Sequence, residues 1–298
     1  MKEPSPRASR LAMAAGIVAL GVVGGGGFLL GQRSAPDRPV PVSPVVTVKD
    51  ATPAPITSPS GILARADLLA LAAEAADATA RGDGMPAAVR DAVGKSFAIA
   101  LPFGCDGPAD AGSDAGMRWR YDEAAGALRI NVTPVTWSPG DWWTTDGPSD
   151  AETIEGFWIP RPWTRSEACP AARASTTPEG AAPVTLAGQT LAIGQAFGAD
   201  GTRQGRRDGK AYASVLRMAL DEVNWSKGLA LRLTGRLASG PNGGPATCRQ
   251  PGGAEQRPVC LILISLEEVA IADPTMDTVL VTWPTGSPRN EGAPRPAR

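Results

Sequence analysis

The stretch that decides the fold is residues 117–132, which read MRWRYDEAAGALRINV. Apolar side chains alternate with polar ones on both sides of a short turn that contains Gly126. Alternation with a period of two is typical of a β-strand with one buried face. Two such runs around a glycine-containing turn predict an antiparallel hairpin.

Further strand-like segments lie around this hairpin. Residues 259–266 form an unbroken apolar run, which predicts a strand buried on both faces, and residues 269–272 extend it. The other candidate strands are residues 97–101, 190–198, 211–219, 229–237 and 278–283. Residues 135–182, rich in Pro and Trp, are expected to be irregular. The sequence therefore predicts an α+β, mainly β domain with an antiparallel, sandwich-like sheet.

A short helical hairpin is expected in front of the sheet, with helices near residues 61–81 and 86–93. Ser60 is the candidate N-cap of the first helix, and Gly82 follows its last turn. Apolar residues recur there at helical spacing, which predicts the buried face: Ile62, Leu63, Ala66, Leu69, Ala70 and Ala73.

The N-terminal region predicts a membrane anchor. Residues 11–31 are apolar and uncharged, and about 20 residues at ~1.5 Å each cover the ~30 Å hydrocarbon layer. Residues 1–10 carry three basic side chains against one acid, which predicts a cytoplasmic tail. The expected protein is a single-pass inner-membrane protein whose C-terminal domain is periplasmic. The alternative is a cleaved signal peptide and secretion to the periplasm.

The rest of the chain divides by composition. Residues 32–60 are a Pro-rich linker, which is expected to hold residues 61–286, the extracytoplasmic β-rich domain, away from the bilayer. Residues 287–298 are expected to be a disordered polar tail.

Composition excludes several functions. The net charge of −1 provides no global basic field for nucleic acid. The chain has no histidine, which excludes Ser-His-Asp and Cys-His catalysis and histidine-ligated metals. Heavy use of Ala, Gly, Pro and Arg is typical of a GC-rich bacterial genome, so the expected location is the bacterial envelope.

Four cysteines are present, and an even number in an oxidising compartment predicts two disulfides. Pairing neighbours in sequence favours Cys105–Cys169 and Cys248–Cys260 over the two other connectivities. The intervals do not match paired metal-binding cysteines, so no metal site is expected.

The Pro-rich stretch concentrates tryptophans and acids. The tryptophans are Trp137, Trp142, Trp143, Trp158 and Trp163. If these tryptophans are exposed, they could stack on sugar rings, with Asp141, Glu152 and Glu155 as candidates for glycosidase acid and base. The alternative, which we favour, is that these tryptophans form a local core.

Arginines form a second candidate site. Residues 199–210 are expected to be a hairpin tip, and Arg203, Arg206 and Arg207 could bind phosphate or carboxylate groups there. A solvated turn is the simpler interpretation. Four strand arginines fit either a solvent-exposed sheet face or a contact surface: Arg118, Arg120, Arg232 and Arg236.

These observations favour a non-catalytic envelope protein that binds another envelope protein or assembles with itself. No cofactor is expected, since no nucleotide-binding or nucleophile motif is present in the sequence. One alternative is glycan binding or hydrolysis by the Trp/acid segment. Another is lipid binding, with residues 259–266 as a pocket wall.

Overall fold

The computed structural model describes residues 61–143, 151–170, 189–198, 205–219, 222 and 227–285. The expected cytoplasmic tail (1–10), signal anchor (11–31), linker (32–60) and C-terminal tail (287–298) lie outside these residues. Among the described residues, no helix is long and apolar enough to span a bilayer. The described part is mainly β with two α-helices, in agreement with the predicted class.

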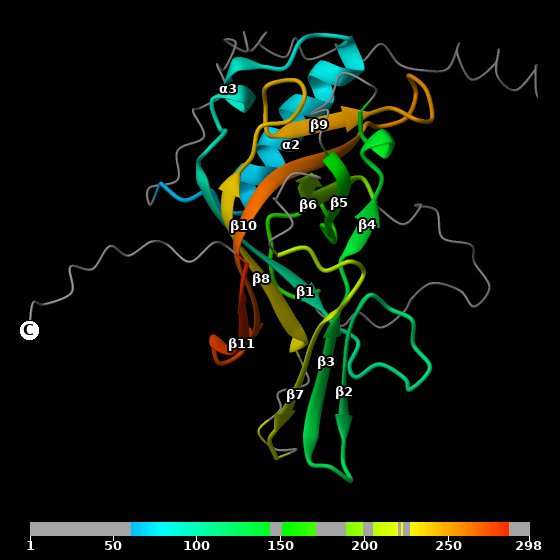
Figure 1. Ribbon diagram of the computed structural model, residues 1–298, viewed down its shortest axis with the longest axis vertical. Coiled ribbons are helices and arrows are strands. Elements are labelled where there is room, and N and C mark those ends of the chain that lie inside the picture. The colour runs from blue at the N-terminus through cyan, green and yellow to red at the C-terminus, as the bar shows by residue number, and fades with distance from the viewer. Residues whose placement is uncertain are drawn as a thin grey trace, which may run out of the picture. The chain divides into compact units, whose positions relative to one another are not determined.

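Eight strands form the larger sheet (Figure 1). Its path runs through β1 (Ser96–Phe103), β8 (Leu229–Leu237), β10 (Val259–Asp273), β6 (Leu191–Gly198), β5 (Ala151–Trp158) and β4 (Val135–Trp137). β9 (Ala246–Arg249) and β11 (Thr278–Pro284) also pair with β10. The pair β6–β10 is parallel, so the sheet is mixed and not purely antiparallel as expected.

Strand β10 joins the two halves of this sheet. Residues 260–263 pair with β6 and β9, whereas residues 264–273 pair with β8 and β11. The register against β8 shifts between Leu266 and Glu268, and the Gln195 side chain accepts the Leu266 N–H at 2.8 Å. The predicted apolar strand is confirmed, and the side-chain oxygen of Gln195 satisfies a backbone donor beside the register shift.

The burial of β10 on both faces explains its apolar run. Cys260, Ile262 and Ile264 belong to the main hydrophobic core, which also contains residues of helix α2 (Arg65–Arg81). Leu261 and Leu263 belong to a second, smaller core. Successive side chains of a strand point to opposite faces, so a strand between two cores needs apolar residues at every position.

The predicted hairpin is confirmed in a separate three-stranded sheet. It consists of β2 (Met117–Asp122), β3 (Ala127–Val132) and β7 (Tyr212–Arg217), all antiparallel. Trp119 lies opposite Ile130, and both side chains are buried.

Helix α2 (Arg65–Arg81) begins later than expected. Leu63 instead bonds to β1, with its N–H donating to Ser96 and its carbonyl accepting from Ala98. The residue before the helix is therefore Ala64, whose N–H donates to Asp67 Oδ2 at 2.8 Å; Ser60 is not its N-cap. α3 (Ala87–Arg90) is shorter than the predicted 86–93.

The buried face of α2 also differs from the prediction. Ile62 is 45% exposed and Ala73 is exposed. The buried face is therefore rotated from the predicted one. It contains Arg65 and the following apolar residues of α2: Leu68, Leu71, Ala72, Ala75 and Ala76. The helix packs mainly on β9 and β10.

Two other expectations about loops are wrong. The stretch 135–182 is not irregular throughout, because it contains β4 and the buried strand β5. The two strands on either side of residues 199–210 do not form the expected hairpin either. The strand before them, β6, pairs with β5 and β10 of the large sheet, whereas β7 after them pairs with β3 of the small sheet.

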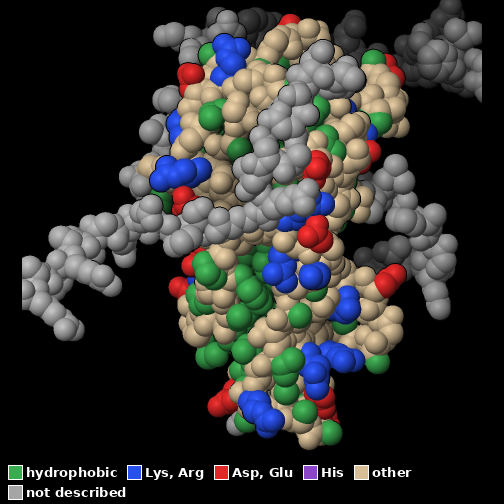
Figure 2. Space-filling view, viewed as in Figure 1, with side chains coloured by type: hydrophobic (Ala, Val, Ile, Leu, Met, Phe, Trp, Pro, Cys, Tyr) green, Lys and Arg blue, Asp and Glu red, His purple; other side chains and the backbone are tan. Residues whose placement is uncertain are grey.

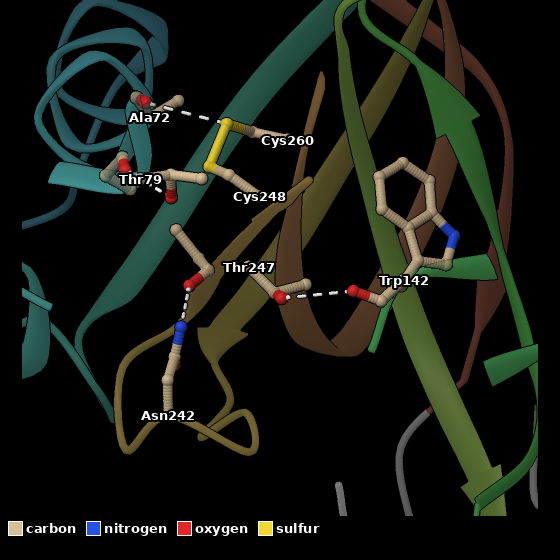
Figure 3. The surroundings of a disulfide bond; sticks show 9 residues. Ala72, Thr79, Trp142, Asn242, Thr247, Cys248 and Cys260 are labelled. Atoms are coloured by element: carbon tan, nitrogen blue, oxygen red, sulfur yellow. Dashed lines mark hydrogen bonds between the residues drawn. A yellow bond between two sulfur atoms is a disulfide. The ribbon is translucent and has the colours of Figure 1, made fainter. Parts of the chain in front are cut away.

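Two disulfides are formed, Cys105–Cys169 and Cys248–Cys260, and these are the pairs expected from the sequence. Cys248 lies directly opposite Cys260 in the β9–β10 ladder. Figure 3 shows this disulfide near Ala72 of α2, while the neighbouring Thr247 points the other way, toward the carbonyl of Trp142. Such bonds indicate an oxidising, extracytoplasmic compartment.

Candidate binding surfaces

Four of the five candidate tryptophans belong to the second core. The ring centroid of Trp137 lies 5.6 Å from that of Trp142 and 5.5 Å from that of Trp158, both in edge-to-face geometry. Trp142 is only 3% exposed, and Trp143 and Trp158 pack against the same core. Their apolar partners are Ile154, Ala192, Leu261 and Leu263. The four tryptophan side chains cover one face of β5, β6 and β10.

The candidate acids hold local backbone structure. Asp141 Oδ2 accepts the N–H of Ser138 at 2.9 Å and closes a 3-10 turn, Pro139–Asp141. Glu155 is buried in β5, where its two carboxylate oxygens accept the N–H groups of Arg207 (2.7 Å) and Asp208 (2.8 Å). Glu152 is exposed and forms an ion pair with Arg206 at 3.3 Å.

Arg206 and Arg207, the arginines of residues 199–210 that the structure describes, bind β5 and the residues that follow them, 208–211. Arg206 pairs with Asp208 as well as with Glu152. Arg207 Nη2 donates to the Ala211 carbonyl at 2.7 Å, and its guanidinium lies 4.6 Å from the ring centroid of Tyr212. Burial raises the pKa of Tyr212, and Arg207 opposes that shift. Arg203 lies outside the described residues.

Trp163 is separated from the other tryptophans. It is 70% exposed on the loop 159–170, which follows β5. Its sequence neighbours are polar or Pro, whereas Trp158, which lies five residues earlier between Phe157 and Ile159, packs into the second core. We call residues 159–170 the Trp163 loop.

A buried arginine fixes the first half of the Trp163 loop. Arg65 of α2 is 2% exposed. Its Nε donates to the Thr164 carbonyl at 2.9 Å, and its Nη2 donates to the carbonyls of Pro160 (2.6 Å) and Arg161 (3.1 Å). Burial lowers the pKa of Arg65, and the nearby Glu167 carboxylate opposes this effect. Sequence analysis missed this residue, because a lone arginine in an amphipathic helix is ordinarily solvated.

The second half of the Trp163 loop is tied to β1. Glu167 Oε1 accepts the N–H of Ala100 at 3.0 Å, and the disulfide joins Cys169 to Cys105, two residues after β1. Since the Ala98 N–H is bound to Leu63 and Pro102 has no N–H, the outer edge of β1 is also closed to further strands. The loop therefore presents Trp163 from a backbone that is fixed at both ends.

The strand arginines divide into two groups. On the large sheet, Arg232 forms an ion pair with Asp277, and Arg236 forms one with Glu267. On the small sheet, Arg118 Nη1 donates to the Ala115 carbonyl at 2.6 Å. Arg120 is exposed and makes no hydrogen bond or ion pair with the described residues. Its cross-strand neighbour Arg129 bonds Asp122 Oδ2 through Nε (3.1 Å) and Nη2 (2.9 Å).

A metal site is not formed by the described residues, since no group of three or more acids or cysteines gathers there in a ligating arrangement. No protein-family model, no curated protein and no solved structure matches the chain.

Proposed function

We propose that the chain is a non-catalytic, single-pass protein of the bacterial envelope, anchored by residues 11–31. Its periplasmic domain binds another envelope protein, and the Trp163 loop forms the centre of that contact. The observation that carries this proposal is the combination of a 70% exposed indole with a loop fixed by Arg65, Glu167 and a disulfide.

Trp is the residue type most enriched among interface residues that dominate binding energy. Holding it on a fixed loop lowers the conformational entropy that binding must overcome. The carboxylates of Asp141 and Glu155 accept hydrogen bonds from backbone N–H groups, which supports a binding role over hydrolysis. The cavity beside Cys260 of β10 has a volume of about 20 Å³, which leaves no room for an acyl chain at that part of the predicted pocket wall.

The test is photo-crosslinking in cells that express the full-length chain with a photoreactive residue at position 163. Met276, which is 56% exposed in the turn between β10 and β11, is the matched control position. The expected result is a protein adduct formed from position 163 and not from position 276. The trapped protein, once purified, should bind the Trp163→Ala chain roughly thirtyfold more weakly, as for a hot-spot residue of ~2 kcal/mol.

Equal adducts from both positions, or no adduct, would contradict the proposal. Co-sedimentation with purified cell-wall sacculi that is lost in Trp163→Ala would instead support the glycan alternative. That alternative retains Trp163 as its exposed stacking residue, because Trp142 is buried.

A further inference from the structure

The outer face of the small sheet carries an arginine-lined pocket. We propose that this pocket binds carboxylate side chains of a short acidic segment in a partner protein. The pocket measures about 260 Å³ and lies between the sheet and residues 109–111. Its lining on the three strands includes Arg118, Arg120, Arg129, Asn131, Ala213 and Val215. We call it the arginine pocket.

Strand register brings the arginines together. Arg120 of β2 lies directly opposite Arg129 of β3, which in turn lies opposite Val215 of β7. Directly opposed residues of an antiparallel pair have Cβ atoms ~4.5–5.5 Å apart, and like charges there are destabilising. Asp122 offsets the charge of Arg129 through two hydrogen bonds, whereas among the described residues it acts on Arg120 through its charge alone, without a hydrogen bond. A carboxylate from another molecule would give Arg120 the hydrogen-bonded acidic partner that Arg129 already has in Asp122.

The chemistry of the lining selects carboxylates on a peptide. A guanidinium presents N–H donors in a planar fork that matches a carboxylate. The other side of the pocket is apolar, with Ala213 and with Val215, which is 56% exposed. An acidic segment can place its charged groups on the arginines and its methylene or apolar groups on Val215. Figure 2 shows blue Lys and Arg side chains among green apolar ones over the region where Figure 1 shows β2, β3 and β7.

The surrounding charges favour a short acidic segment over a long polyanion. Asp110 lines the same pocket, and Asp122 and Glu123 line a second hollow beside it. These carboxylates would repel a continuous anionic polymer on either side of the arginines. The net charge of −1 for the whole chain also provides no long-range attraction for nucleic acid.

The test uses the full-length purified chain and a short fluorescent peptide in which Glu alternates with Val, compared with the same peptide carrying Gln for Glu. We expect salt-dependent binding of the Glu peptide that is weakened at least about tenfold by Arg120→Glu, since hydrogen bonds to charged groups dominate. Arg217→Glu is the matched control, because Arg217 lies on β7 in the row of Asp122 and Ala127, outside the pocket lining.

Equal binding of the Gln peptide, equal loss in Arg217→Glu, or no binding of the Glu peptide would overturn the proposal. Displacement of the peptide by inorganic phosphate at peptide-like concentrations would also overturn it, in favour of a simple oxyanion site. This pocket does not depend on the Trp163 loop, so Trp163→Ala is expected to bind the Glu peptide like the unmodified chain.

Discussion

Arg65 and Thr164, which are 99 positions apart in the sequence, are joined by a hydrogen bond of 2.9 Å from the guanidinium Nε to the backbone carbonyl. This bond connects the first turn of α2 to the loop that displays Trp163. Together with the two bonds from Nη2, it makes one buried side chain the link between the helix and that loop.

Replacing Arg65 should therefore destabilise the protein and loosen the loop. Arg65→Met keeps much of the side-chain volume but leaves three carbonyls without their donor. Since removing a charged partner of buried groups costs ~1.5–3 kcal/mol, we expect a loss of about that size in the free energy of unfolding. Chemical denaturation measures the loss, and hydrogen exchange should be faster at residues 161–169.

The matched control for this variant is Arg81→Met at the other end of α2. Arg81 is exposed, and its ion pair within the described part of the chain is with Asp83, two positions away. A change within about 0.5 kcal/mol is expected there. Equal losses for Arg65→Met and Arg81→Met would mean that the contacts of Arg65 contribute nothing specific.

The two classes of tryptophan should respond differently to truncation. Trp142→Ala removes a buried side chain from the second core and should cost about 3–5 kcal/mol of unfolding free energy. Trp163→Ala removes an exposed one and should cost about 0.5 kcal/mol or less. Denaturant unfolding of both variants checks this difference, and a large loss in Trp163→Ala would show that its indole is part of the core.

Local pattern predicted the hairpin of β2 and β3, the strand β10 and the cysteine pairs. The two strands of the hairpin are close in sequence, the burial of β10 is visible as an apolar run, and each disulfide joins cysteines that are consecutive among the four in the chain. The strand β5 was missed because Glu152, Glu155 and Gly156 break its apolar alternation. Their role depends on distant residues: Glu155 binds the turn at Arg207 and Asp208, and a Cβ at Gly156 would lie 2.1 Å from the Ile193 carbonyl oxygen.

Long-range pairing also decided what each candidate site residue does. The sequence placed five tryptophans in one group, but only the pairing of β5 with β6 and β4 determines which of them face a core. The same holds for the strand arginines. Arg232 and Arg236 receive acidic partners from Asp277 and Glu267, whereas the register of β2 places Arg120 opposite another arginine.

The disulfide at Cys105–Cys169 should stabilise both the domain and the Trp163 loop. It closes 64 residues, against 12 for Cys248–Cys260, so loop entropy predicts contributions of about 4 and about 3 kcal/mol. The double variant Cys105→Ser/Cys169→Ser should lower the melting temperature and speed proteolysis near Trp163. Cys248→Ser/Cys260→Ser is the control, and equal cleavage near Trp163 in both variants would contradict a local role.

The ion pair of Asp122 and Arg129 should make the small sheet sensitive to acid. The hydrogen bonds from Arg129, followed by that from the Ala125 N–H, lower the pKa of Asp122 below its ordinary value of 3.8. Because the folded-state pKa is the lower one, the stabilisation is present above the unfolded-state pKa. It is lost as the pH falls through the folded-state pKa, so the sensitive window lies below about pH 4.

An NMR titration of the Asp122 carboxyl carbon in the wild-type chain and in Arg129→Gln tests whether Arg129 causes the lowered pKa. We expect a depressed pKa in the wild type and a return toward the ordinary value in the variant, while Arg232→Gln, on the large sheet, should leave Asp122 unchanged. An ordinary pKa for Asp122 in the wild type would mean that Arg129 is not held by this carboxylate, and Arg129 would then be as free as Arg120 to bind an external acid.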